Sequence, residues 1–371
     1  MRIDHAAVWR EGAFHTGSVS MVDGLFCEDS GGEGYDAEGL FALPGLVDIH
    51  VHGFGGADFS SGDVDALEAM ALGLARVGVT AFCAATVTME ADALARACRT
   101  ASGFAGSEGG ASLLGINLEG PFLSPHRAGA HEKAHLRGPE VALFERLWRA
   151  ADGRIALMTM APELPGAPWL IEHAASRGVV VSLGHTVCGY DAAIAAFEAG
   201  ARSVTHLYNG MTALTAREPG LVGAAVDSAC FAELICDGVH VHPSSVRAAF
   251  KLFDRSRIVL VSDGLSPAGL GDGTFALGGQ SITVSGRRAT LADGTLAGSV
   301  ASLIDCLRAC VAMGIPLADA VGCATVNPAR LLGLEGERGT IAPGLRADLV
   351  LVDGDLNVKQ VFIAGRSLLP E

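Results

Sequence analysis

The feature that most constrains this fold is an alternation of short apolar segments with helical patterns along the chain. The apolar segments, which we predict to be strands, lie within residues 44–53, 78–87, 112–118, 154–160, 179–183, 202–205, 232–236 and 257–261. Eight buried strands separated by helices are typical of an α/β fold, the (β/α)8 TIM-type barrel, in which all strand C-terminal ends share one face. Side chains that directly follow the strands should therefore gather at one end of the barrel.

The first predicted strand ends in two histidines, His50 and His52, within the segment PGLVDIHVHG. Side chains alternate faces along a strand, so these two project to the same side about 7 Å apart, within reach of one divalent ion. The neutral imidazole is the commonest metal ligand in proteins. The alternative is a pair of strand-end histidines bonded to the backbone, so the metal interpretation needs further ligands at later strands.

Later strands supply such ligands. A carboxylate or a histidine follows the third, fifth, sixth and eighth strands at Glu119, His185, His206 and Asp263. Five ligand-type side chains from four strands, together with the aspartate at the eighth, favour a metal site over isolated structural histidines. Asp263 lies where it could accept the proton of a water molecule; its alternative role is to cap a turn or a helix.

The two ends of the chain have a different pattern. Residues 1–43 and the segment 347–366 contain short alternating runs separated by turn residues, which is typical of strands and hairpins. We therefore predict a small β-sandwich domain built from residues 1–43 and 341–371, and a barrel over residues 44–340.

Local signals mark several elements of the barrel. We expect Asp63 to cap a helix that stops at Gly78. A β-hairpin region is expected over residues 274–295, and a helix capped by Ser299 should reach about Met313.

The composition limits the possible partners. The formal net charge is −15, which argues against non-specific binding to nucleic acid or to an anionic membrane. The nine cysteines lack paired C-x2-C spacing, so we expect reduced thiols in a cytoplasmic protein rather than disulfides or a cysteine zinc site. The sequence contains no signal-peptide pattern at its start and no uninterrupted apolar run of membrane-spanning length, so no membrane association is expected.

Short motifs that are more specific than a histidine pair occur along nearly the whole chain. They are PGLVDIHVHG (44–53), GINLEGPFLS (115–124), GAH (129–131), LGHT (183–186), THLYNGM (205–211), REPG (217–220), DGVH (237–240), SDG (262–264) and LAGS (296–299). With these motifs the chain resembles the amidohydrolase superfamily and, within it, the N-acetylglucosamine-6-phosphate deacetylases. Other branches bridge two metals through a carboxylated lysine after the fourth strand, but no lysine lies there in this chain, and Glu119 can take that role.

The resemblance implies a metal-dependent hydrolase. Its substrate would be N-acetylglucosamine 6-phosphate, whose acetamide it would convert to glucosamine 6-phosphate and acetate in amino-sugar catabolism and cell-wall recycling. Glu119, His185 and His206 would hold the principal ion, and His50 and His52 with Glu119 a second one. One or two divalent ions per subunit are therefore implied, with zinc expected first and iron, manganese or cobalt as alternatives.

The resemblance also assigns the remaining site residues. Asp263 would act as the general base and acid, and His131 would polarise the acetyl carbonyl; the alternative for His131 is a solvated loop histidine. The implied substrate contacts are Ala130, His131, Asn209, Gly210, Arg217, His240, Leu296, Ala297 and Gly298. Arg217 is expected to reach the phosphate in the neighbouring subunit, which implies a homodimer.

Two other functions stay open at this point. The same chemistry on N-acetylgalactosamine 6-phosphate differs by the orientation of one hydroxyl, which the sequence does not resolve. A catalytically inactive sugar-phosphate-binding protein on the same fold is a further alternative, disfavoured by the presence of Asp263 and of every metal ligand.

Overall fold

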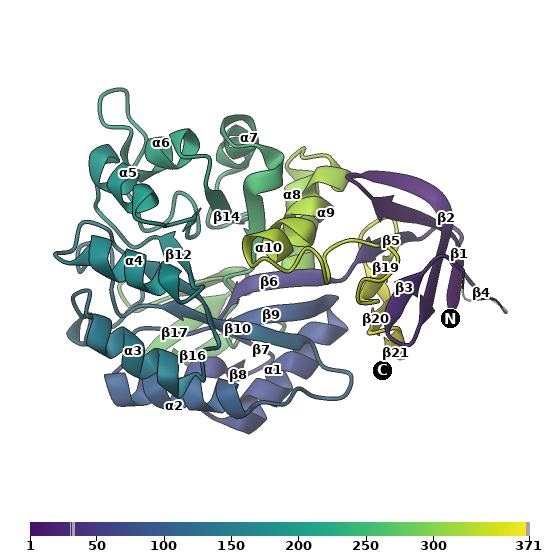
Figure 1. The fold of residues 1–371 in the computed structure, drawn as a ribbon, viewed down its shortest axis with the longest axis horizontal. Helices are drawn as coiled ribbons and strands as arrows, with labels where there is room; N and C mark the ends of the chain where they lie inside the picture. The colour runs from purple at the N-terminus through teal and green to yellow at the C-terminus, as the bar shows by residue number, and fades with distance from the viewer. Residues whose placement is uncertain (30, 32–33, 369–371) are drawn as a thin grey trace.

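A barrel of eight parallel strands forms the centre of the fold, in a computed structural model that describes residues 1–29, 31 and 34–368 (Figure 1). The strands are β6 (Leu46–Val51), β9 (Val79–Ala85), β10 (Ser112–Glu119), β11 (Ile155–Met160), β12 (Val180–Leu183), β13 (Ser203–Val204), β14 (Phe231–Ile235) and β15 (Ile258–Val261). They pair in this order, and a parallel bridge between Val51 and Gly264 joins the two ends. Each strand lies within two residues of its predicted position, so the barrel prediction is confirmed.

Helices connect the strands and cover the outside of the barrel (Figure 1). They are α1 (Val64–Arg76), α2 (Ala91–Gly103), α3 (Val141–Ala150), α4 (Ala167–Ser176), α5 (Tyr190–Glu198), α6 (Gly220–Asp227), α7 (Pro243–Leu252), α8 (Leu303–Ala312), α9 (Leu317–Ala324) and α10 (Val326–Leu331), with single 3-10 turns η1 (Phe59–Ser61), η2 (Lys133–His135) and η3 (Arg255–Arg257). Asp63 caps α1 as predicted, because its side chain accepts the Asp65 backbone N–H. Gly78 adopts a φ of 86° just after this helix, a left-handed conformation that stops it.

The predicted helix start at Ser299 is wrong by a few residues. Helix α8 begins at Leu303, and Ser302 caps it through a reciprocal capping box with Asp305. Ser299 instead pairs with Gly264 in a parallel bridge. Ser299 is therefore held beside the chain that follows β15, and the helix starts only after this bridge.

The two termini form a second sheet beside the barrel, as predicted (Figure 1). Its strands run in the order β21 (Arg366–Leu368), β20 (Val358–Ile363), β19 (Leu349–Val352), β5 (Phe41–Pro44), β1 (Arg2–Arg10), β2 (Ala13–Val22) and β3 (Leu25–Cys27), with β4 (Gly34–Asp36) paired to β1. This sheet encloses its own apolar core, which includes Ile3, Val8 and Phe362. The domain boundaries at residues 43 and 341 stay a prediction.

A three-stranded antiparallel sheet lies between β15 and α8, in the predicted hairpin region. It consists of β16 (Gly273–Leu277), β17 (Gln280–Ser285) and β18 (Arg288–Thr290), while β7 (Gly53–Phe54) and β8 (Ala57–Asp58) form a small hairpin after β6. Apolar side chains of the three strands pack on Val87 and Leu265, which follow barrel strands. The sheet thus sits over the C-terminal end of the barrel. Among the described residues, no helix combines the length and apolar character that a membrane crossing needs.

Candidate metal centre and active site

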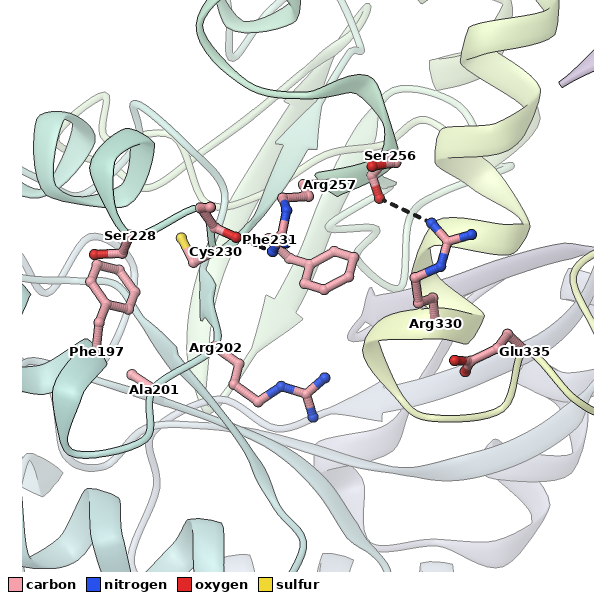
Figure 2. A pocket seen from close by; sticks show the side chains of 11 residues that line it. Phe197, Ala201, Arg202, Ser228, Cys230, Phe231, Ser256, Arg257, Arg330 and Glu335 are labelled. Atoms are coloured by element: carbon pink, nitrogen blue, oxygen red, sulfur yellow. Dashed lines mark hydrogen bonds between the residues drawn. The ribbon is translucent and has the colours of Figure 1, made fainter.

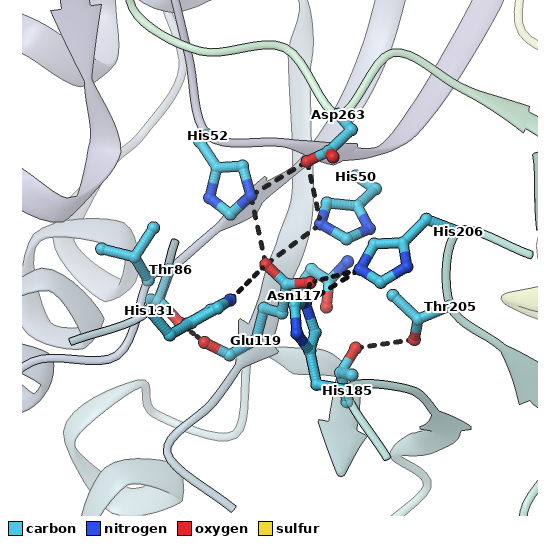
Figure 3. Close-up of polar contacts among 12 residues, drawn as sticks. His50, His52, Thr86, Asn117, Glu119, His131, His185, Thr205, His206 and Asp263 are labelled. Atoms are coloured by element: carbon cyan, nitrogen blue, oxygen red, sulfur yellow. Dashed lines mark hydrogen bonds and ion pairs between the residues drawn. The ribbon is translucent and has the colours of Figure 1, made fainter. Parts of the chain in front are cut away.

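The predicted ligands meet at the C-terminal end of the barrel (Figure 3). They come from the ends of β6 and β10, from the loops after β12 and β13, and from the loop after β15: His50, His52, Glu119, His185, His206 and Asp263. All six side chains are buried. His185, His206 and Asp263 have positive φ angles of 46°, 31° and 49°, a conformation that non-glycine residues rarely adopt and that is often found at active sites.

One carboxylate oxygen of Glu119 faces two histidines. Its Oε1 lies 3.2 Å from His185 Nε2 and 3.1 Å from His206 Nε2, and these two nitrogens are 3.0 Å apart. We call these three groups the principal set. Ligands at about 2.0–2.1 Å from a tetrahedral zinc ion are about 3.3 Å from one another, so the principal set has the dimensions of one face of such a site.

The other oxygen of Glu119 faces the β6 histidines. Its Oε2 lies 3.4 Å from His50 Nε2 and 3.2 Å from His52 Nε2, and we call these three groups the second set. Asp263 Oδ1 lies beside this set, 3.2 Å from His52 Nε2 and 3.6 Å from His50 Nε2. The two oxygens of Glu119 thus face the two sets separately.

Hydrogen bonds on the far side of the rings hold these orientations. His185 Nδ1 donates to the Arg127 carbonyl at 2.7 Å, and His206 Nδ1 donates to the Asn209 carbonyl at 3.2 Å. A ring whose Nδ1 carries the proton presents Nε2 as a lone pair, which is the form that binds metal. Among the described residues, the buried His50 Nε2 has no hydrogen-bond partner. The imidazole nitrogens and carboxylate oxygens of the two sets are suitable ligands for a divalent metal ion.

Asp263 and His52 form an ion pair that shifts both of their pKa values. Burial alone would lower the pKa of His52, but Asp263 and Glu119 raise this pKa to about 9. Burial opposes ionisation of Asp263, yet His52 and His50 lower its pKa to about 2. Asp263 is therefore an ionised carboxylate at neutral pH, a proton acceptor beside the second set.

His131 approaches the centre from the loop after β10. Its Nδ1 accepts the Thr88 backbone N–H at 3.0 Å, so the proton of the neutral ring sits on Nε2. This Nε2 lies 3.3 Å from Glu119 Oε2. Burial lowers the pKa of His131 to about 4, which keeps the ring neutral. His131 can therefore donate a hydrogen bond into the site, and its alternative as a solvated loop histidine is excluded because its side chain is buried.

A cavity of about 260 Å³ opens onto this centre. Its lining includes His52, Glu119, His131, His185, His206 and Asp263 and most of the predicted substrate contacts, namely Ala130, Asn209, Gly210, His240, Leu296, Ala297 and Gly298. His50 lies beneath them, fully buried. Arg217 is exposed and does not line the cavity, so the single chain does not bring it to the site.

A second cavity, of about 440 Å³, lies at the opposite ends of β13, β14 and β15 (Figure 2). Arg202, Arg257 and Arg330 line it, but Arg257 donates to the Ala229 carbonyl and Arg330 to the Ser256 carbonyl. Active sites of such barrels lie at the C-terminal ends of the strands. The smaller cavity at the metal centre is therefore the candidate active site.

Three buried carboxylates around the centre were given no role by the sequence, although the motifs PGLVDIHVHG and DGVH include Asp48 and Asp237. Asp237 accepts His240 Nδ1–H at 2.7 Å and orients that ring, and Asp48 accepts the Ser262 hydroxyl at 2.5 Å. Glu233, in the middle of β14, lies 2.9 Å from His50 Nδ1. The available signal was a charged residue inside an apolar strand segment, which applies to Asp48 and Glu233.

The comparisons with known proteins agree with this geometry. Residues 41–368 match the amidohydrolase family. The chain belongs to this family. It is 39% identical over 322 residues to N-acetylglucosamine-6-phosphate deacetylase of Bacillus subtilis (strain 168), covering 85% of this chain and 81% of that protein. It is 37% identical over 334 residues to N-acetylgalactosamine-6-phosphate deacetylase of Escherichia coli O157:H7, covering 89% and 88%.

Solved structures of deacetylases also resemble this amidohydrolase over nearly its whole length. N-acetyl-D-glucosamine-6-phosphate deacetylase from Mycobacterium smegmatis superposes with a TM-score of 0.94 at 32% identity and full coverage of both chains. A mutant of that enzyme in complex with N-acetyl-D-glucosamine-6-phosphate has a TM-score of 0.92 at 33% identity, covering 99% of this chain and 98% of that chain.

Proposed function

We propose that this amidohydrolase hydrolyses the acetamide of N-acetylglucosamine 6-phosphate to glucosamine 6-phosphate and acetate. The observation that carries the proposal is the Glu119 carboxylate between two pairs of histidines, with the ionised Asp263 beside it, at the floor of the cavity. Relatives that cover most of the chain are named for this reaction. The inactive alternative is disfavoured, because every group that the hydrolysis needs faces one cavity.

Divalent metal ions complete the proposed site. The principal set would hold one ion and the second set another, with zinc expected first and iron, manganese or cobalt as alternatives. When bound, such an ion supplies Lewis acidity, which lowers the pKa of a water molecule from about 15.7 towards about 7. The number of ions is one or two per subunit, according to whether the second set is filled.

The chain's own side chains carry the proton transfers. Asp263, ionised at neutral pH, accepts the proton of the attacking water and returns it to the nitrogen of the departing amine, which leaves poorly unless it is protonated. His131 donates its Nε2–H to the acetyl oxygen, where negative charge develops as the water attacks. Both side chains line the same cavity.

We assign substrate binding to residues at the rim of the cavity. His240, whose ring is held by Asp237, and Asn209 with Gly210 would contact the phosphate end of the sugar. Ala130 and residues 296–298 would enclose the ring from the other side. The preferred epimer of the substrate is open, because a relative named N-acetylgalactosamine-6-phosphate deacetylase is 37% identical over 334 residues. Kinetics on both 6-phosphates will decide between them.

The activity is tested by metal depletion and restoration. The purified protein should release acetate from N-acetylglucosamine 6-phosphate, lose this activity after chelation, and regain it when a divalent ion is added back. An enzyme that is fully active with no detectable metal, or one that releases no acetate from either epimer with its sites loaded, would overturn the proposal.

The phosphate also needs a cation, and we propose that Arg217 supplies it to a neighbouring subunit of a homodimer. Arg217 is exposed in the loop before α6 and lies outside its own chain's cavity, and Leu214 of the same loop is 47% exposed. A guanidinium grips phosphate through paired hydrogen bonds.

Mixing Arg217→Ala with Asp263→Ala under conditions of subunit exchange tests this shared site. If Arg217 acts in trans, one site of each heterodimer carries both lesions and the other carries neither, so activity returns in the mixture. A confirmed heterodimer that is no more active than its parents contradicts the shared site and leaves the metal chemistry untouched.

The cellular location is proposed as cytoplasmic. All nine cysteines are free thiols and eight of them are buried, which fits a reducing compartment. Thermal stability and electrophoretic mobility that are the same with and without reductant would support this location. A disulfide in protein isolated under alkylating conditions would contradict it.

A further inference from the structure

Glu233 is a buried carboxylate that the proposed chemistry leaves unused. It lies in the middle of β14, whose other residues are Phe231, Ala232, Leu234 and Ile235, and its own exposure is 0%. Removing a carboxylate from water costs several kcal/mol unless partners compensate for it, so its contacts should reveal its role.

Glu233 contacts two of the histidines in the predicted ligand sets, His50 and His206. Its Oε2 accepts His50 Nδ1–H at 2.9 Å and the backbone N–H of His206 at 3.4 Å. Its Oε1 is buried and has no hydrogen-bond partner among the described residues. The side chain therefore reaches across from β14 to the end of β6 and to the loop after β13.

His50 is held differently from the histidines of the principal set. His185 and His206 each donate Nδ1–H to a neutral backbone carbonyl, whereas His50 donates to a carboxylate. A carboxylate partner fixes the tautomer and also increases the electron-donating strength of the opposite nitrogen. In His50 that nitrogen is Nε2, which faces Glu119 Oε2 at 3.4 Å.

We propose that Glu233 is the positioning residue that turns the second set into a divalent-metal site, and thus determines whether the enzyme binds two ions. The assignment deepens the proposed function, on which it rests for the role of the second ion. Glu233 contacts the ring of His50 alone, at 2.9 Å from its Nδ1; its longer contact with His206, 3.4 Å, is to the backbone N–H, and the His206 ring is held by the Asn209 carbonyl instead. The carboxylate does not line the cavity.

The experiment measures metal binding without substrate. Wild type, Glu233→Gln and Glu233→Met are stripped of metal and titrated with Zn²⁺ against a competing chelator, and with Co²⁺ followed by its visible absorption. The glutamine variant can still accept the His50 proton but lacks the charge, and the methionine variant lacks both. Thermal unfolding of each metal-free variant shows that it is folded.

We expect two ions per chain in the wild type and a selective loss at the second set. Glu233→Gln should weaken only the second ion, by about 10- to 100-fold, and Glu233→Met should weaken it further. His50→Asn should abolish the second ion, and adding Glu233→Gln to His50→Asn should have no further effect, because the two residues act as one unit.

Asp237→Asn provides the matched control. Asp237 holds His240 Nδ1 at 2.7 Å in the same way, but His240 belongs to neither ligand set. This variant should bind both ions normally and raise KM for the sugar phosphate. The control therefore separates a general effect of removing a buried carboxylate from the specific effect at His50.

Three results would overturn the assignment: a wild type that binds one ion, folded Glu233 variants that bind both ions with wild-type affinity, or an Asp237→Asn variant that loses the second ion equally. Failure of the proposed function is distinguishable from these, because it would appear as absent acetate release from a wild type that binds both ions. In that case the metal assignment to Glu233 stands while the reaction does not.

Discussion

Replacing Asp263 by asparagine tests the proposed general base with the least disturbance of the fold. Asp263 has a φ of 49°, and Asn and Asp adopt this left-handed conformation more readily than other non-glycine residues. Its backbone is held apart from its carboxylate, since its N–H donates to the His50 carbonyl and its carbonyl accepts from Ser299 N–H, both at 2.9 Å. The asparagine variant should therefore keep the site geometry and lose only the proton acceptor.

The expected loss follows from the ionisation of Asp263. In the metal-free protein His52 and His50 lower the pKa of Asp263 to about 2 against the effect of burial, so the carboxylate is ionised at neutral pH. General acid–base catalysis contributes about 10²- to 10⁴-fold. We expect kcat to fall by that factor in Asp263→Asn, which is about 3–5 kcal/mol of activation free energy.

The assay is initial-rate release of acetate, with metal content measured on the same samples. Asp263→Ala serves as a comparison: it should lose as much activity and in addition about 1–2 kcal/mol of stability, because alanine tolerates the left-handed φ poorly. An asparagine variant with both ions bound and a kcat within about tenfold of the wild type would remove Asp263 from the proton-transfer step.

Further predictions concern the ligands, the phosphate and pH. Glu119→Gln should lower the occupancy of the principal ion, measured by elemental analysis, whereas His50→Asn should lower only that of the second; unchanged metal content and activity in His50→Asn would refute the two-ion interpretation. Arg217→Ala should chiefly raise KM for the phosphorylated sugar and spare any weak activity on the unphosphorylated sugar; equal losses on both sugars would speak against a phosphate contact. The metal-free protein should lose stability as the pH rises from 6.5 through 9, because the pKa of His52 is raised from 6.5 to about 9. Denaturant unfolding of the chelated protein across this range checks the last point, and a flat profile contradicts it.

The sequence predicts the barrel well because its signals are local. Apolar segments such as residues 79–85 are buried along their whole length, and a side chain that ends one strand shares the barrel face with those ending the others. His50, Glu119 and Asp263 could therefore be brought together without a structure. The start of α8 could not, because Ser299 and Ser302 are equivalent helix caps by type. The choice depends on the bridge of Ser299 to Gly264, which is a long-range contact.

Supporting carboxylates are harder to predict for a related reason. Glu233 and Asp48 each look like a charged interruption of an apolar strand, and only the folded barrel brings Glu233 to His50 and Asp48 to Ser262. Burial raises the pKa of Asp48 to about 6, a consequence of packing that no spacing reveals. Arg217 is the reverse case: a sequence motif points to it as a site residue, but the structure of the single chain leaves it exposed and away from the site.

The charge balance of the centre explains why metal binding and pH should be linked. Three buried carboxylates, Glu119, Glu233 and Asp263, surround His50 and His52. Without a metal, protons on the two imidazoles must balance this charge, and accordingly Glu119 and its neighbours raise both histidine pKa values against the effect of burial.

A group whose pKa is raised on folding stabilises the protein below the pKa of the unfolded state, here 6.5. This stabilisation is lost as the pH rises through the pKa of the folded state, about 9 for His52. A bound divalent ion would replace those protons as the balancing charge. The stability of the metal-loaded protein should therefore depend less on pH in this range than the stability of the metal-free protein. The difference between the two pH dependences measures how strongly the carboxylates favour a metal ion over protons.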